Sequence, residues 1–173
     1  MATRETARPM TDGQCSDFIA RIRHYADGKA FEMTLDGDAA ENQPIEMVRR
    51  DGYDKPSEWK HKGATVKGTQ TRKFVWVSVG YQPNLDAVRA VCLEAAGKLG
   101  LNGRIPEGQW REAIKQMFHH LGQYIRGIAD PSWEYPGGGI RFPYVGSDGR
   151  SCFYWGDYGY GEAWRWLVEV ESK

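Results

Sequence analysis

The chain has 173 residues, a formal net charge of zero at pH 7 and a mean hydropathy of −0.64. This length fits a single domain that can bury a sizeable core. The hydrophilic average and the lack of a long apolar run exclude a membrane span. The zero net charge excludes binding to nucleic acid or to a membrane by bulk electrostatic attraction.

We expect residues 1–10 to form a disordered tail, because they offer little apolar surface to bury, and residues 11–173 to form a single α+β domain. The tail lacks the apolar segment of a secretory signal. Cys15, Cys92 and Cys152 lie far apart and form no Cys-x-x-Cys pair, which is typical of reduced thiols in the cytosol. These features predict a cytoplasmic protein with no membrane partner.

The first predicted elements are a helix and two short strands. Residues 11–14 resemble a capping box, and the apolar spacing after them predicts a helix that ends at Gly28. Strict alternation over residues 29–35 predicts a strand with one wet face. An acidic loop, residues 36–46, leads into a second short strand over residues 45–49.

Residues 59–80 are predicted to form a hairpin. Residues 64–67 enter it, Gly68 turns the chain, and residues 69–79 return as the most β-prone run of the sequence. The side chains expected to face the helices are Val75, Val77 and Val79.

Two helices are predicted next. Asn84 caps the first and Gly100 ends it, while Pro106 begins a second that runs until Asp130 and Pro131 stop it. Strands that are grouped, rather than alternating with helices, indicate an α+β fold with a largely antiparallel sheet. We expect the N-terminal helix and this central helix pair to pack on one face of that sheet.

The stretch 131–170 holds 11 of the 22 aromatic residues and is threaded with glycines. Two β-prone runs, 139–145 and 150–155, flank a Gly/Asp loop and predict a hairpin, and a proline in the first run suggests an edge strand. Alternation over residues 162–171 predicts a third strand, with a short helix as the alternative. The chain is therefore expected to end in an aromatic-rich meander.

Charge is unevenly distributed along the chain. Residues 27–58 contain nine acids and four bases, whereas residues 59–85 contain five lysines and arginines and no acid. Cations for phosphates beside rings for bases are what single-strand-binding surfaces use. The predicted nucleic-acid-binding residues are Trp59, Lys60, His61, Lys62, Lys67, Arg72 and Lys73. The alternative is a solvated hairpin that balances the acidic segment before it.

Eleven aromatic rings exceed what one small apolar face can cover. One interpretation is that most of them pack in the core, and the other is that several near the glycine loops stay exposed. Exposed tyrosine, tryptophan and arginine are the residue types that dominate protein interfaces. The predicted partner-binding residues are Tyr135, Tyr158, Tyr160, Trp164 and Arg165.

The chain contains no strong catalytic or metal-binding motif. His119 and His120 are adjacent on a predicted helix and point about 100° apart, so they suit the surface better than a shared ligand site. Asp157 and Glu162 flank a Gly/Tyr loop, as the carboxylates of a glycosidase would, but they fit loop caps equally well. Phosphate-loop and dinucleotide-binding patterns are absent. We therefore assign no catalytic residue, metal ligand or cofactor.

Taken together, these patterns predict a non-enzymatic binding protein that contacts nucleic acid or a nucleoprotein complex through the basic hairpin and exposed aromatic rings. The alternative is a protein–protein inhibitor or accessory module, such as one encoded by a mobile element. That module would act through the aromatic C-terminal surface or the acidic loop 36–46. A hydrolase that uses Asp157 and Glu162 is the third hypothesis.

Overall fold

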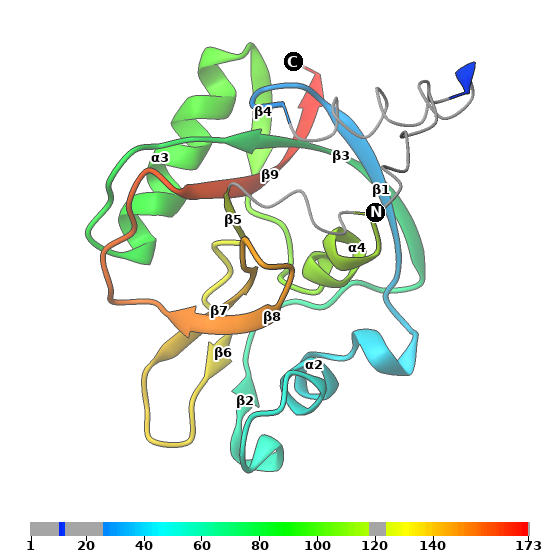
Figure 1. Ribbon diagram of the computed structural model, residues 1–173, viewed down its shortest axis with the longest axis vertical. Coiled ribbons are helices and arrows are strands. Elements are labelled where there is room, and N and C mark those ends of the chain that lie inside the picture. The colour runs from blue at the N-terminus through cyan, green and yellow to red at the C-terminus, as the bar shows by residue number, and fades with distance from the viewer. Residues whose placement is uncertain (1–10, 13–25, 118–123, 173) are drawn as a thin grey trace, which may run out of the picture.

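The computed structural model describes residues 11–12, 26–117 and 124–172, which form a mixed α+β fold (Figure 1). The helices are α2 (Pro44–Arg50), α3 (Leu85–Lys98) and α4 (Trp110–Met117), with 3-10 turns η1 (Ala40–Asn42) and η2 (Pro56–Glu58). The strands are β1 (Phe31–Asp36), β2 (Lys60–His61), β3 (Thr69–Val77), β4 (Leu101–Arg104), β5 (Ile125–Gly127), β6 (Trp133–Glu134), β7 (Ile140–Val145), β8 (Ser151–Trp155) and β9 (Trp164–Ser172). The predicted tail and nearly all of the predicted N-terminal helix lie outside the described residues.

The strands form one open and mostly antiparallel sheet. Its order is β1-β3-β9-β5-β7-β6-β2, with β4 added to β9 and β8 added to β7. Among the described strand pairs, β5 and β9 alone run parallel. β9 pairs with β3, β4 and β5 and so lies at the centre of the sheet. The α+β class and the largely antiparallel sheet are confirmed.

Both faces of the central strands are buried, each under a different helix. Phe74 and Trp76 of β3 pack in one core cluster with Trp110 of α4. Val75 and Val77 point the other way, into a second cluster that contains the buried side of α3. The prediction that the two helices share one face is therefore wrong. The unbroken apolar run of β3 is typical of a strand that is covered on both faces.

Residues 44–50 form helix α2, where the sequence predicted a strand over residues 45–49. Pro44 occupies the first turn, where an N–H would have no intrahelical partner. Arg49 and Arg50 lie in the last turn, near the negative end of the helix dipole. An apolar run this short does not distinguish a helix from a strand by its periodicity. The residues that indicated a helix were Pro44 at its start and the two arginines at its end.

The second predicted helix is shorter than expected. α4 is described over Trp110–Met117, and β5 occupies Ile125–Gly127, where we expected the helix to continue. β5 lies between β9 and β7, so pairing on both sides outweighs the helical spacing of its apolar residues. A Cβ at Gly127 would lie 2.9 Å from Trp166 and 3.0 Å from Trp164, so glycine lets the strand pass these rings.

The C-terminal hairpin is confirmed, whereas the meander and the hairpin over residues 59–80 are absent from the described chain. β7 pairs with β8, but the next strand leaves to pair with β3. β7 is an internal strand, so the edge position that its proline suggested is wrong. Pro143 is tolerated because its backbone faces the gap between β5 and β6, and its carbonyl there accepts from the N–H of Ile128 (3.2 Å). β3 pairs with β1 and β9, and β2 pairs with β6, so long-range pairing replaces the predicted local turn.

A buried ion pair ties α2, α4 and β8 together. The Arg111 guanidinium donates to both carboxylate oxygens of Asp51, at 2.6 and 3.1 Å, and neither side chain is more than 1% exposed. Arg111 also donates to the Glu112 carboxylate (2.7 Å) and to the carbonyl of Cys152 (3.0 Å). The Ser151 hydroxyl donates to Asp51 (2.6 Å). Asp51, at the end of α2, and Arg111, in α4, thus each also bind a group of β8.

Candidate functional site

The residues predicted to form one basic surface lie in two separate places. Four of them lie on or next to β2, beside β6, and these are Trp59, Lys60, His61 and Lys62. The other three lie in β3 or just before it, and these are Lys67, Arg72 and Lys73. Trp59 is 3% exposed and packs against Tyr135 and Phe153, so the expectation that its ring is open to a base is wrong.

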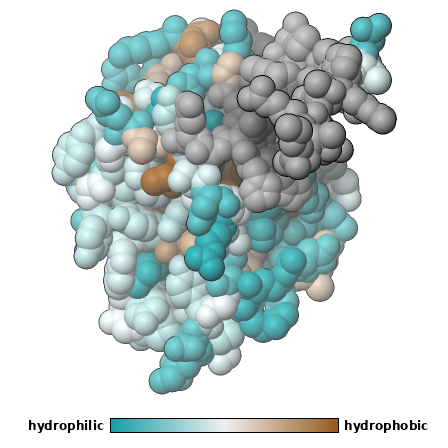
Figure 2. Space-filling model, in the orientation of Figure 1, coloured by the Kyte–Doolittle hydropathy of each residue, from teal (hydrophilic) through white to brown (hydrophobic). Residues whose placement is uncertain are grey.

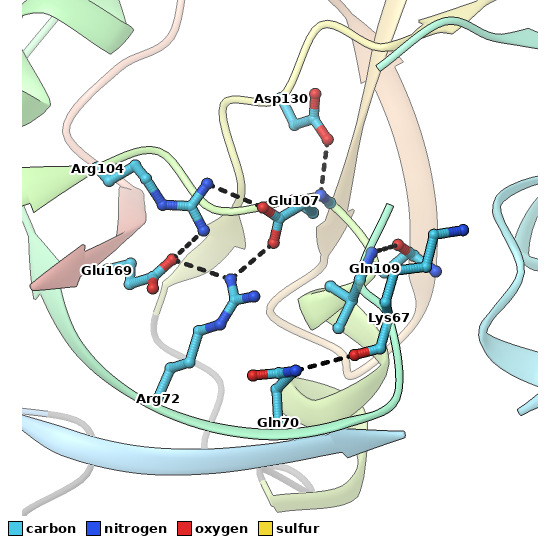
Figure 3. A network of polar contacts seen from close by, with 10 residues as sticks. Lys67, Gln70, Arg72, Arg104, Glu107, Gln109, Asp130 and Glu169 are labelled. Carbon is cyan, nitrogen blue, oxygen red and sulfur yellow. Dashed lines mark hydrogen bonds and ion pairs between the residues drawn. The ribbon is translucent and has the colours of Figure 1, made fainter. Parts of the chain in front are cut away.

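Arg72 is held by two carboxylates instead of facing a ligand. It donates to Glu107 (2.9 Å) and Glu169 (3.3 Å). Arg104 donates to the same two carboxylates and closes a ring of alternating charges (Figure 3). Burial raises the pKa of Glu107, but the hydrogen bond and charge of Arg104, with the charge of Arg72, outweigh it and hold the pKa below its ordinary value. This ring removes Arg72 from the predicted phosphate contacts.

Two of the predicted lysines also have acidic neighbours. The Lys62 ammonium lies 2.5 Å from the Glu134 carboxylate. The hydrogen bond from Lys62 is the main reason that the pKa of Glu134 is lowered. Lys73 stands directly opposite Glu32 in the β1–β3 pair, and both side chains are exposed. Much of the predicted basic surface is therefore balanced within the fold.

The remaining members of the set differ in their surroundings. Lys60 and Lys67 are exposed, and neither has an ion-pair partner in the part of the chain that the structure describes. His61 is half-buried against the Trp133 ring, at 4.5 Å between centroids. Burial lowers the pKa of His61, and the charge of Asp130 opposes this change. Lys60 is the cation of β2 that stays open to a ligand.

Large exposed side chains gather at the end of the molecule formed by β6, β7 and β8. We call this set the aromatic patch, and it consists of Tyr81 (67% exposed), Tyr135 (36%), Ile140 (42%), Trp155 (39%) and Tyr158 (54%). The Trp155 ring lies 6.1 Å from both the Tyr135 and the Tyr158 rings. The Tyr81 side chain lies against Gly159, next to Tyr158. A Cβ added at Gly159 would lie only 2.6 Å from the Tyr81 hydroxyl oxygen.

Figure 2 shows the character of the surface in one orientation. Pale residues of intermediate hydropathy cover the end of the molecule over β6, β7 and β8, at the lower left. Strongly hydrophobic residues appear on this face as small separate areas among hydrophilic ones. A contact surface at this end would therefore consist mainly of amphipathic tyrosine and tryptophan rings, with Ile140 as its aliphatic member.

A buried arginine lies beneath the aromatic patch. The Arg141 guanidinium carbon is 3.1 Å from the centre of the Trp155 ring, 4.4 Å from that of Tyr135 and 5.9 Å from that of Trp59. Arg141 is only 5% exposed. Burial lowers its pKa, and the charges of nearby groups, including Asp157, oppose the change. Stacking on a fixed cation holds the two exposed rings in place.

Three of the predicted partner-binding residues are buried. Tyr160 is 1% exposed and donates from its hydroxyl to the carbonyl of Trp155. Trp164 is 7% exposed and stacks on Trp166, with 5.0 Å between ring centres. Arg165 is 8% exposed and pairs with Asp27 at 2.9 Å. The expectation that these three side chains are exposed is wrong, whereas Tyr135 and Tyr158 do lie on the surface.

Sequence reasoning missed four members of the site: Tyr81, Ile140, Arg141 and Trp155. Tyr81 and Trp155 each adjoin a glycine at the end of a strand run, which is the signal that selected Tyr158. Ile140 and Arg141 begin β7 directly after the triple glycine. No local pattern could show that Arg141 would lie between two rings from other strands.

Other chemistry receives little support from the described residues. They contain no cluster of three or more His, Cys, Asp or Glu side chains that could hold a metal, and none of their helices has the length and apolar character to cross a bilayer. Asp157 and Glu162 are exposed on the segment between β8 and β9. His119 and His120 lie outside the described residues.

A hollow lined by described residues lies beside the ring of charges. It has a volume of ≈ 210 Å³ and is lined in part by Arg104, Glu107 and Asp130. Its carboxylates are already occupied by donors. Asp130 accepts from the N–H of Gly108 (2.7 Å) and from Ser132, while Glu107 accepts from Arg104 and Arg72 (Figure 3). Groups that are held in this way serve structure better than proton transfer.

Comparison with known proteins adds no assignment. No protein-family model, no curated protein and no solved structure matches the chain. The functional argument therefore depends on the geometry of the aromatic patch and of the charges around it.

Proposed function

We propose that this protein is a non-enzymatic binding module that contacts a protein partner through the aromatic patch. The observation that carries the proposal is the cluster of exposed Tyr135, Trp155 and Tyr158 rings with Arg141 stacked beneath them. Tyrosine, tryptophan and arginine are the residues in which binding energy concentrates at protein interfaces. An interface centre is also poor in charged groups, as this patch is.

Preorganisation of the rings supports the same proposal. An exposed ring that moves freely loses rotamer freedom on binding, at about 0.5–1.5 kcal/mol per side chain. Tyr135 and Trp155 are already fixed by the Arg141 guanidinium, and Tyr135 also packs edge-on against buried Trp59. Little ordering remains to be done when a partner docks, so more of the contact energy appears as affinity.

Binding of single-stranded nucleic acid is the second candidate, and one observation favours it. Lys60 lies on β2 and Lys62 directly follows it, next to the strand that leads into Tyr135. Cations beside exposed rings suit a backbone with stacked bases. The ion pair of Lys62 with Glu134 and the closed ring around Arg72 leave few cations for phosphates, so the salt-dependent part of such binding would be small.

A capture experiment separates these two candidates. The tagged protein is incubated with lysate of the organism that encodes it, with and without nuclease, and bound proteins are quantified by mass spectrometry. The test variant is Trp155→Ala with Tyr158→Ala. The matched control is Leu93→Ala, which removes an exposed apolar side chain (43%) from α3, outside the patch.

We expect a protein that the wild type and the control capture equally, that resists nuclease, and that the double variant captures at least about 30-fold less, as loss of one interface hot spot implies. Equal capture by the double variant would refute the proposal. Loss of the partner on nuclease treatment would favour the nucleic-acid candidate, which an oligonucleotide titration across a salt series then tests directly.

A further inference from the structure

Arg141 differs from the buried Arg111 and Arg165 in having no carboxylate partner among the described residues. Arg111 pairs with Asp51 and Glu112, and Arg165 pairs with Asp27. For Arg141, the described residues supply no ion pair and no hydrogen bond, and its buried Nε has no acceptor. Its contacts are the faces of the surrounding aromatic rings.

A buried cation without a fixed counter-charge is costly for a folded protein. Cation–π contacts with the surrounding rings offset part of this cost. The lowered pKa of Arg141, which burial causes, is consistent with a charge that the fold leaves partly uncompensated. Natural proteins rarely keep such a group unless it meets an anion.

The stacking geometry leaves the hydrogen-bonding edge of the guanidinium available. Trp155 and Tyr135 contact it with their ring faces, at 3.1 and 4.4 Å from the guanidinium carbon. The N–H groups of a guanidinium point outward in its own plane, away from rings stacked on its faces. Both rings are more than one-third exposed, so the slot between them reaches the surface.

We propose that Arg141 is the anion subsite of the aromatic patch and binds the carboxylate of an aspartate or glutamate side chain presented by the protein partner. This inference rests on the proposed function. A partner that binds in this way would carry one acidic side chain surrounded by apolar surface, because Ile140, Tyr135 and Trp155 lie around the guanidinium. A carboxylate and a guanidinium pair through two parallel hydrogen bonds.

Local charge favours a carboxylate over a phosphate group. Asp157 already acts electrostatically on Arg141, and Glu134 lies one residue from Tyr135. A single guanidinium next to these acids can balance one added negative charge. A phosphate monoester brings a charge of about −1.5 to −2 and three acceptor oxygens, which call for a cluster of cations. A planar carboxylate also fits between two rings better than a tetrahedral group.

The test follows the side-chain Nε–H signal of Arg141 by ¹⁵N NMR in the full-length protein. Sodium acetate, inorganic phosphate and sodium chloride are titrated at constant ionic strength. The signal is assigned with Arg141→Lys or, if that variant does not fold, with Trp155→Phe, which changes the ring current on the guanidinium. The Arg111 signal is the internal control, since its guanidinium is already paired with Asp51.

We expect a saturable shift of the Arg141 signal with acetate, no such shift with chloride, and an unmoved Arg111 signal. A linear response, or no response, to acetate would overturn the inference. So would a tenfold lower midpoint for phosphate, which would instead indicate a phosphate ligand. If the patch variants no longer capture the partner and acetate does not shift the Arg141 signal, this inference fails and the proposed function stands. If acetate shifts the Arg141 signal but the patch variants still capture the partner, the proposed function fails and Arg141 remains an anion site.

Discussion

Replacing Asp51 by asparagine tests whether the buried ion pair holds α2, α4 and β8 together. Asparagine keeps the oxygen that accepts from the Ser151 hydroxyl and from one Arg111 nitrogen (3.1 Å), but it turns an amide N–H toward the other Arg111 nitrogen, which lies 2.6 Å from the native carboxylate. Breaking a buried pair costs about 3–5 kcal/mol, because one charge stays buried without its partner. We expect the lower end, since Glu112 still accepts from Arg111 (2.7 Å).

The assay is urea unfolding, with thermal melting as a second readout. A loss of about 3 kcal/mol corresponds to a fall of roughly 6–12 °C in melting temperature for a domain of this size. The control is Glu46→Gln, which breaks the exposed Glu46–Arg49 pair and should change stability little, because solvent screens an exposed ion pair. If Asp51→Asn costs no more than the control, the reasoning is refuted.

A double variant separates the loss of the pair from general damage. Asp51→Ala with Arg111→Met removes both charges and leaves Glu112 its contact with Lys115, at 3.1 Å. Because apolar replacements can substitute for a buried pair, the double variant should be less destabilised than the sum of the two single changes. Additive losses would show that the two side chains do not act together.

Two further predictions concern the centre of the sheet and the ring of charges. Gly127→Ala should lower the free energy of unfolding in urea by about 1–3 kcal/mol, because its Cβ would lie within 3.0 Å of two tryptophan rings. The control Gly97→Ala, in open space on α3, should be neutral or stabilising. Equal effects of the two changes would contradict this prediction. The lowered pKa of Glu107 adds stability that is present above its unfolded pKa and is lost as pH falls through the folded value. Glu107→Gln should therefore unfold more easily at pH 7 and lose less stability between about pH 5 and pH 3 than the wild type, and an unchanged pH slope would contradict that cause.

Local patterns predicted the elements that local interactions decide. The alternation of residues 29–35 predicted β1, whose Phe31, Met33 and Leu35 are all buried. Asn84 does cap α3, since its side-chain oxygen accepts from the N–H of Ala87 (2.9 Å). For α3 the deciding contact lies within three residues of the signal, and for β1 the alternation itself shows which side chains are buried, although the strand pairs with the distant β3.

Elements that depend on distant partners were missed. β5 has a helical spacing of apolar residues, and it becomes a strand because β9 and β7 lie on either side of it. Tyr158 and Tyr160 have nearly identical neighbours in sequence, yet the first is 54% and the second 1% exposed. Tyr160 is drawn inward by a backbone bridge to Gln82 and by packing against Phe142. Nothing within the loop sequence distinguishes the two rings.

The central position of β9 sets the order in which the protein can assemble. β1 and β3 pair with each other, as do β7 and β8, and within the sheet β9 and its parallel neighbour β5 join these two pairs. During synthesis the ribosome releases β9 after every other strand described. Until then, β3 presents an apolar edge without its neighbour, which is a surface prone to aggregation. We therefore expect the growing chain to be most prone to aggregation before this strand emerges and joins the two units.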